Sequence, residues 1–205
     1  MNWVRLSYLN GVSSIERAYR ESVRAFEAEG ARSGERWQRL RSEPDFDADD
    51  EETRHHAEHL GEIALQSEQS VKAVREAFAL ILYHYWEQRA CFHLNVKHYN
   101  QQNVFDKASD FFKIETVGID RLRQIVNMLK HGKDELFKNE PGLFDQTLIP
   151  QMPLSEDELG PEAFHYRNAL RLSAADLDAA FVAVKASGPS SEYPPEEDDE
   201  ETVAS

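Results

Sequence analysis

The chain of 205 residues has a single cysteine, Cys91, so no internal disulfide can form. Disulfides belong to oxidising compartments, and their exclusion here indicates a reducing one. No run of residues approaches the roughly 18 consecutive apolar positions of a membrane span, and no charged-then-apolar signal stands at the N-terminus. We therefore expect a cytoplasmic protein with no membrane partner, in which Cys91 is a small packed side chain inside an apolar helix.

Motifs for common cofactor chemistries are also missing. There is no glycine-rich phosphate loop, no paired-cysteine zinc pattern and no strand–turn–helix nucleophile elbow, which disfavours ATP-driven and dinucleotide chemistry. The segment HHAEH places His55 and His59 at i, i+4 on one helix face, a spacing that can bind a metal. The HExxH pattern is absent, however, and the surrounding Glu and Arg favour an exposed polar face. We expect no metal and no cofactor.

Basic residues are scarce, with 23 Lys and Arg against 38 Asp and Glu, for a net charge of −15. Such a balance argues against a free-standing, high-affinity nucleic-acid binder, because phosphate contacts need cations. Much of the excess lies in two acidic blocks, Glu43–Glu52 and Glu192–Glu201. The remainder of the chain is closer to neutral and leaves room for a small basic surface.

Helical periodicity dominates the remaining pattern, with little β signal, so we predict a single all-α domain over residues 1–187. A first helix is expected over 12–28, ended by Gly30, followed by a loop over 31–50. Residues 188–205, rich in Pro, Ser and acids, are expected to form a disordered acidic tail.

From Asp49 the pattern becomes helical again, and Gly61 or the polar residues 66–69 either divide this segment or bend it. Its second half is apolar on nearly all sides, which predicts a long central helix of the bundle over 67–97. Further expectations are a short helix around 105–112 and an extended piece around 164–172. A last helix is capped by Ser173, and its inner face is formed by Leu177, Ala180, Phe181 and Val184.

The stretch IDRLRQIVNMLKHGK, residues 119–133, combines an amphipathic helix with reactive side chains. At about 100° per residue, one face is apolar and should be buried. Gly132 should end the helix in the left-handed conformation. The apolar face comprises Ile119, Leu122, Val126 and Leu129, with Ile125 at its edge.

Arg123, Asn127, Lys130 and His131 follow a separate polar strip beside that apolar face. His131 falls in the last turn, where the negative end of the helix dipole stabilises a protonated imidazole. A histidine beside a fixed cation and an amide suits acid–base chemistry on a phosphodiester. The alternative is a solvated helix end whose Lys and His side chains cap free carbonyls.

Taken together, the segments ALILYHYWEQR and LRQIVNMLKHG resemble the HEPN superfamily, small all-α domains found in bacterial toxin–antitoxin and antiviral defence systems. The resemblance covers about residues 67–140. The family's signature is an Arg, commonly followed by Asn, His or Asp, then a short spacer and a His near the end of a helix. Asn127 and His131 match its second and last positions, and Lys130 and Gly132 occur likewise in many relatives. At the position of the signature Arg stands Val126, and Arg123, one turn earlier, is the nearest substitute.

The resemblance implies metal-independent RNA cleavage. His131 would move a proton at the ribose 2′-hydroxyl or the leaving oxygen, while Arg123 or Lys130 would stabilise the phosphorane charge. Asn127 would orient the phosphate or the imidazole, and Glu87 on the central helix could face the strip. Pairing of two copies, as in many family members, would bring in a second His131.

A different function is also compatible with the sequence. Val126 at the Arg position and the charge of −15 suit a non-catalytic immunity or accessory subunit that binds a basic partner protein of the same operon through these helices. The acidic tail has two interpretations as well: a solubilising terminus, or a polyanion that covers Arg123, Lys130 and His131 until RNA or a partner displaces it.

Overall fold

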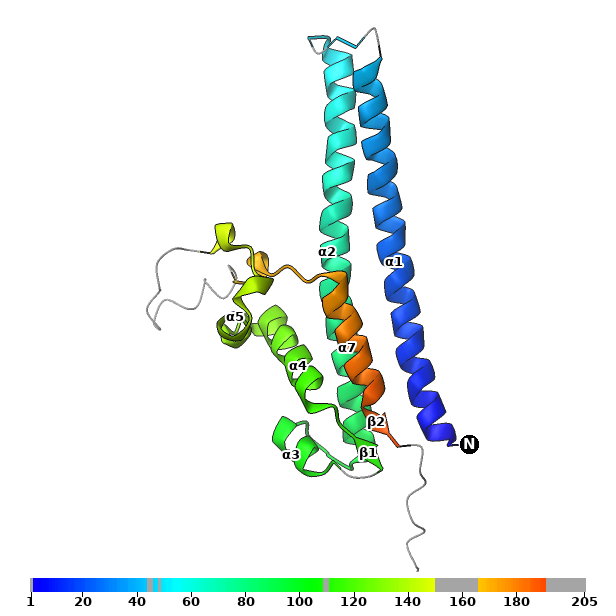
Figure 1. The fold of residues 1–205 in the computed structure, drawn as a ribbon, viewed down its shortest axis with the longest axis vertical. Coiled ribbons are helices and arrows are strands. Elements are labelled where there is room, and N and C mark those ends of the chain that lie inside the picture. The colour runs from blue at the N-terminus through cyan, green and yellow to red at the C-terminus, as the bar shows by residue number, and fades with distance from the viewer. Residues whose placement is uncertain (1, 44–45, 48, 109–110, 150–165, 191–205) are drawn as a thin grey trace, which may run out of the picture.

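Two long antiparallel helices form the frame of the protein. The computed structural model describes residues 2–43, 46–47, 49–108, 111–149 and 166–190. Helix α1 spans Trp3–Ser42, and helix α2 spans Glu51–His93 and returns beside it, as Figure 1 shows. The lower half of α2 contacts α1, α4 and α7, so the prediction of an all-α bundle around this central helix is confirmed.

Both long helices begin at polar caps that satisfy free backbone amides. The Asn2 side chain accepts from Val4 N and Arg5 N, and the Asp50 side chain accepts from Thr53 N. Neither Gly61 nor the polar residues 66–69 interrupt α2, which is continuous to His93. Aromatic rings then join the two helices, since Tyr8 packs on Tyr85 and Tyr19 packs on Phe78.

The predicted loop over residues 31–50 is wrong for its first twelve residues, which continue α1. Gly30 is not a stop, because a side chain there would lie 3.1 Å from Ser67 Cβ, so the glycine permits close packing of the two helices. Beyond it, Ser33 is buried and the Arg41 guanidinium lies 4.7 Å from the centre of the Trp37 ring. The packing of α1 on α2 and the contact between Arg41 and Trp37 within α1 keep the segment helical.

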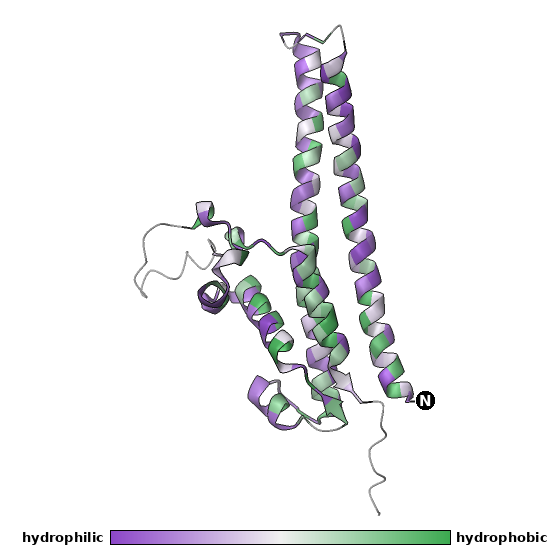
Figure 2. Cartoon of the chain, in the orientation of Figure 1, coloured by the Kyte–Doolittle hydropathy of each residue, from purple (hydrophilic) through white to green (hydrophobic). Residues whose placement is uncertain are grey.

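Two further helices pack on the lower half of α2 and complete the core. Helix α4 spans Thr116–His131 and α7 spans Ala174–Ala186. Figure 2 shows α7 as largely hydrophobic, whereas the upper ends of α1 and α2 are mostly hydrophilic. Ser173 and Asp176 form a capping box at the start of α7, and its four predicted inner residues are all buried. This prediction is confirmed.

Short elements connect these helices, and several differ from the predictions. The expected helix over 105–112 lies earlier, because α3 spans Gln101–Asp106 and Phe112–Lys113 is strand β1. The expected extended piece over 164–172 contains a helical turn at 166–169, and its Leu170 pairs with Phe144. The remaining short elements are α5 (Glu135–Asn139), η1 (Pro141–Leu143), η2 (Gln146–Leu148) and β2 (Gly188–Pro189).

The ordered part of the chain extends past residue 187, the predicted end of the all-α domain. Strand β2 pairs antiparallel with β1, and Ser190 N donates to Phe111 O. Gly188 has φ of 96° and lies against the Tyr8 ring, where no side chain would fit. Residues 191–205, the rest of the predicted tail, lie outside the described residues. Residues 188–190, predicted to belong to the disordered tail, are therefore part of the folded body.

The first turns of α1 hold the end of α7 in place. Arg5 donates to the carbonyls of Lys185 and Ser187, and the Tyr8 hydroxyl donates to Val184 O at 2.6 Å. The Asn2 side chain donates to Ser190 O at 2.9 Å. The bonds from Arg5 and Tyr8 satisfy carbonyls that the end of α7 leaves free, and the Asn2 bond holds the chain after β2.

A charged network fixes α4 against its neighbours. Arg121 donates through Nε and Nη2 to the Glu140 carboxylate and through Nη2 to Asp176, a member of the capping box of α7. Its side chain retains 27% exposure. The network therefore joins three segments that are distant in sequence and sets the position of α4.

Candidate functional site

Helix α4 carries the candidate site, and its ends are defined by specific caps. The Glu115 side chain accepts from Gly118 N at 2.7 Å, and Gly132 ends the helix at φ of 64°. All five apolar residues predicted for the inner face are buried (Ile119, Leu122, Ile125, Val126 and Leu129). The prediction of a buried apolar face is confirmed, whereas the polar side of α4 is half-buried along its middle and exposed only at the helix ends.

The polar strip of α4, defined as Arg123, Asn127, Lys130 and His131, differs in exposure along its length. Lys130 and His131 are exposed at the helix end, whereas Asn127 is half-buried. Among the described residues, none of these three side chains forms a hydrogen bond or ion pair with another residue. The amide, ammonium and imidazole groups are thus free to contact a ligand.

Arg123, in contrast, is already paired with carboxylates. Its guanidinium lies 3.0 Å from Asp120 Oδ1 and 3.6 Å from Glu135 Oε1. Burial acts to raise the pKa of Asp120, but hydrogen bonds from Gln101, Gln124 and Arg123 outweigh it, so this pKa is lowered. Asp120 therefore stays ionised, and Arg123 is held along the helix with much of its charge neutralised.

A pair of tyrosines lies close to Arg123 and to Glu87 of α2. The hydroxyls of Tyr83 and Tyr99 are 2.6 Å apart. Burial raises the pKa of both tyrosines; the Glu87 charge raises each further, whereas Arg123 lowers it. Glu87 and Arg123 are thus brought near the same pair of phenols, but the carboxylate itself is hydrogen-bonded to His84 Nδ1 at 2.9 Å.

Val126 stands where the HEPN signature would place an Arg, and this residue is only 1% exposed. It belongs to the packed face of α4 and cannot be exchanged for a cation without placing that cation in the core. Arg123, the nearest substitute, belongs to the polar strip but is paired with Asp120 and Glu135. A single chain thus presents the side chains of Asn127, Lys130 and His131, while Arg123 is paired with carboxylates of its own chain.

The histidine segment HHAEH lies in the first turns of α2. His55 and His59 lie on α2, and among the described residues no group of three or more His, Cys, Asp or Glu side chains is placed to hold a metal ion. Cys91 is half-buried, and burial raises the pKa of its thiol. That shift works against a reactive thiolate.

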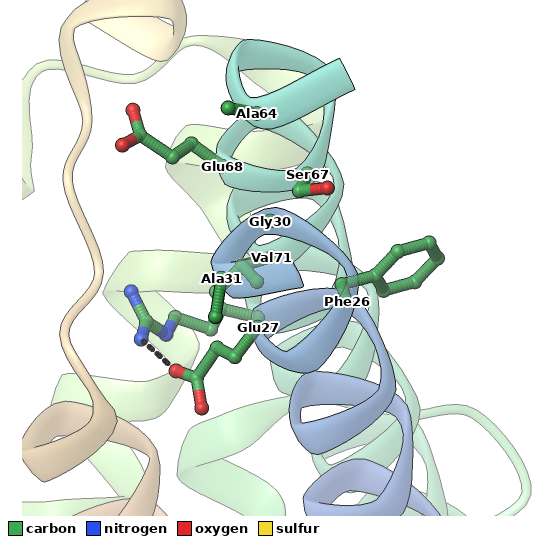
Figure 3. Close-up of a pocket in the computed structure, with 9 residues that line it drawn as sticks. Phe26, Glu27, Gly30, Ala31, Ala64, Ser67, Glu68 and Val71 are labelled. Carbon is green, nitrogen blue, oxygen red and sulfur yellow. Dashed lines mark ion pairs between the residues drawn. The ribbon is translucent and has the colours of Figure 1, made fainter. Parts of the chain in front are cut away.

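A groove between α1 and α2 lies away from the strip, with a cavity of about 380 Å³ beside Gly30 and Ser67. Figure 3 shows the Glu27 and Glu68 carboxylates on the same side of the helix pair, and the Phe26 ring on the other. Glu27 lies 4.0 Å from Arg75. The opening follows from the small residues where the helices approach, and its two acids have no arrangement that suggests catalysis.

Sequence reasoning missed the counter-charges of the strip. Asp120 stands three residues before Arg123, a spacing at which helical side chains meet, and this signal could have indicated the pair. Glu135 reaches Arg123 only because the chain turns at Gly132 into α5. The pairing of Glu135 with Arg123 depends on tertiary structure, so no local sequence pattern could have predicted it.

Comparisons of the chain with protein-family models, curated proteins and solved structures found no match. Within the described ranges, no helix has the length and hydropathy to cross a membrane.

Proposed function

We propose that this chain is an HEPN-like protein of a bacterial defence or toxin–antitoxin type system that cleaves RNA without a metal ion. The observation that carries the proposal is the exposed Lys130–His131 pair at the capped end of α4, with both side chains free of partners among the described residues. An imidazole beside a fixed ammonium can exchange a proton with a 2′-hydroxyl while the cation stabilises the phosphorane.

Each residue of the strip has a role in this proposal. His131 acts as the acid–base group, Lys130 stabilises the developing charge, and Asn127 orients the phosphate. Arg123 positions the strip through Asp120 and becomes available when RNA phosphates compete with the carboxylates. Glu87 does not contact the RNA in this proposal; its charge acts on the Tyr83–Tyr99 hydroxyls, which also feel the Arg123 charge.

A second copy of the chain completes this proposed site. One strip contributes a single histidine, whereas general acid and general base catalysis of the same step use two proton-transfer groups. Two strips facing each other in a homodimer supply two copies of His131 and a higher local positive charge. The chain acts in the cytoplasm, where Cys91 remains reduced.

The proposal is tested with purified full-length protein and single-stranded RNA in the presence of EDTA. We expect cleavage by the wild-type protein, loss of at least about 100-fold with His131→Ala, and wild-type activity with His98→Ala. His98 is a matched control, since it is also exposed and lies outside α4. Equal cleavage by the His131→Ala variant would exclude the role of His131.

A non-catalytic accessory subunit is the second candidate, and the pairing of Arg123 with Asp120 and Glu135 favours it. With Val126 in the core and the nearest Arg neutralised, α4 and the central helix α2 would be a docking surface for a partner protein of the same operon, and the net charge of −15 favours a basic partner. Absence of RNase activity, together with a complex with the neighbouring gene product that weakens as salt increases, selects this function.

A further inference from the structure

An exposed aromatic groove lies where the start of α1 meets the end of α2. Trp3 and Phe92 retain 69% and 76% exposure, and Val4 retains 46%. With Arg89 and His93, these residues line a cavity of about 290 Å³. Large apolar side chains exposed together commonly mark a binding surface.

The charge around this groove contrasts with that of the whole chain. Residues 2–15 and 88–105 contain no Asp or Glu, although the chain as a whole has 38. Arg89 lies in the groove, and its guanidinium is 5.3 Å from the centre of the Tyr85 ring. Burial, followed by the nearby Arg89 charge, lowers the pKa of His93, so Arg89 is the fixed cation of the groove. An occupant with acidic groups beside apolar ones is therefore favoured.

The chain itself supplies such an occupant. Ser190, the last described residue, is bonded through its carbonyl to the Asn2 side chain, one residue from Trp3. Residues 191–205 follow from this point and contain seven acids and no base. Tyr193 is three residues beyond Ser190, so it can lie at most about 10 Å away.

We propose that the segment Tyr193–Pro195 of the same chain binds in the groove of Trp3, Val4, Arg89 and Phe92, with the following acids directed toward Arg89. A Tyr-Pro-Pro sequence favours the extended polyproline conformation, which packs on aromatic side chains with little loss of entropy. Tethering at Ser190 gives the segment a local concentration in the millimolar range. This inference does not depend on RNA cleavage, and it places the tail on the groove in preference to the α4 strip.

Disulfide trapping in the full-length chain tests the proposal. In a Cys91→Ser background, Ser7→Cys at the groove and Glu192→Cys should form an intramolecular disulfide under mild oxidation. Phe92→Ala or Tyr193→Ala should slow this reaction about tenfold, because each removes part of the contact that holds the cysteines together. Val182→Ala is the matched control, since Val182 is 67% exposed on α7 and should leave the rate unchanged.

Two results would overturn the proposal. Equal rates with and without Phe92 and Tyr193 would show that the two cysteines meet without binding of the segment in the groove. Disulfides formed only between two chains would assign the groove to a second copy.

Discussion

Replacement of Arg121 by Met should destabilise the protein by about 2 kcal/mol. Arg121 links Glu140 and Asp176, and its loss leaves two carboxylates close together without a cation. Exposed ion pairs contribute about 0–1 kcal/mol, whereas breaking a buried pair costs about 3–5 kcal/mol. The 27% exposure of Arg121 lies between these cases. For a chain of this size, 2 kcal/mol corresponds to a decrease in Tm of about 4–8 °C.

This effect should depend on pH with a defined sign. Burial acts to raise the pKa of Asp176, but hydrogen bonds from Ser173 and Arg121 outweigh it, so the folded-state pKa is lowered. A lowered carboxyl pKa contributes stability above the unfolded value, and this contribution is lost as the pH falls through the folded value. The difference between wild type and variant should therefore shrink as the pH falls from about 5 to below about 3.

Urea unfolding of the full-length chain, followed by circular dichroism at 222 nm, measures the free energy of unfolding at each pH. Arg24→Met provides the control, because Arg24 pairs with Glu21 in an exposed i, i+3 bridge. Its effect should stay below about 0.5 kcal/mol. An Arg121→Met effect as small as that of Arg24→Met, or one that grows on acidification, would refute the role of the network.

Three further substitutions test the packing of α4 and α7 by the same unfolding measurement. Val126→Arg should destabilise by more than about 4 kcal/mol or prevent folding, because it buries an unpaired charge, and a stable variant would contradict the placement of Val126 in the core. Gly118→Val should cost about 1–3 kcal/mol, since even its Cβ would lie 2.5 Å from Ala183 Cβ; no loss of stability would contradict this close approach. Tyr8→Phe should cost about 1 kcal/mol by leaving Val184 O without its donor, and a neutral effect would exclude that bond.

Elements with local signals were predictable from the sequence. The apolar spacing of α4, its stop at Gly132 and the Ser173 cap of α7 depend on residues within one or two turns, and the structure confirms them. The extent of α1 was not predictable in this way, because Gly30 resembles a helix stop until its packing against Ser67 is known.

Long-range pairing limited the rest of the prediction. Strands β1 and β2 have two residues each and lie far apart in sequence, so they are too short to be predicted from alternating apolar and polar residues. The residues proposed for the site on α4 were chosen from their spacing and their resemblance to the signature, and their common helix follows from that spacing. The neutralisation of Arg123 by Glu135 required the turn into α5, and the proximity of Glu87 to the Tyr83–Tyr99 pair required the packing of α4 on α2.

The central claim is that His131 uses the ribose 2′-hydroxyl to break RNA without a metal. The most direct measurement compares, in EDTA, cleavage of an RNA oligonucleotide with cleavage of the same oligonucleotide carrying a single 2′-deoxynucleotide at the mapped cleavage position. We predict that the wild-type protein cuts the RNA and leaves the 2′-deoxy position intact. The His131→Ala variant should cut neither oligonucleotide. Cleavage at the 2′-deoxy position, or cleavage that requires a divalent metal, would contradict it.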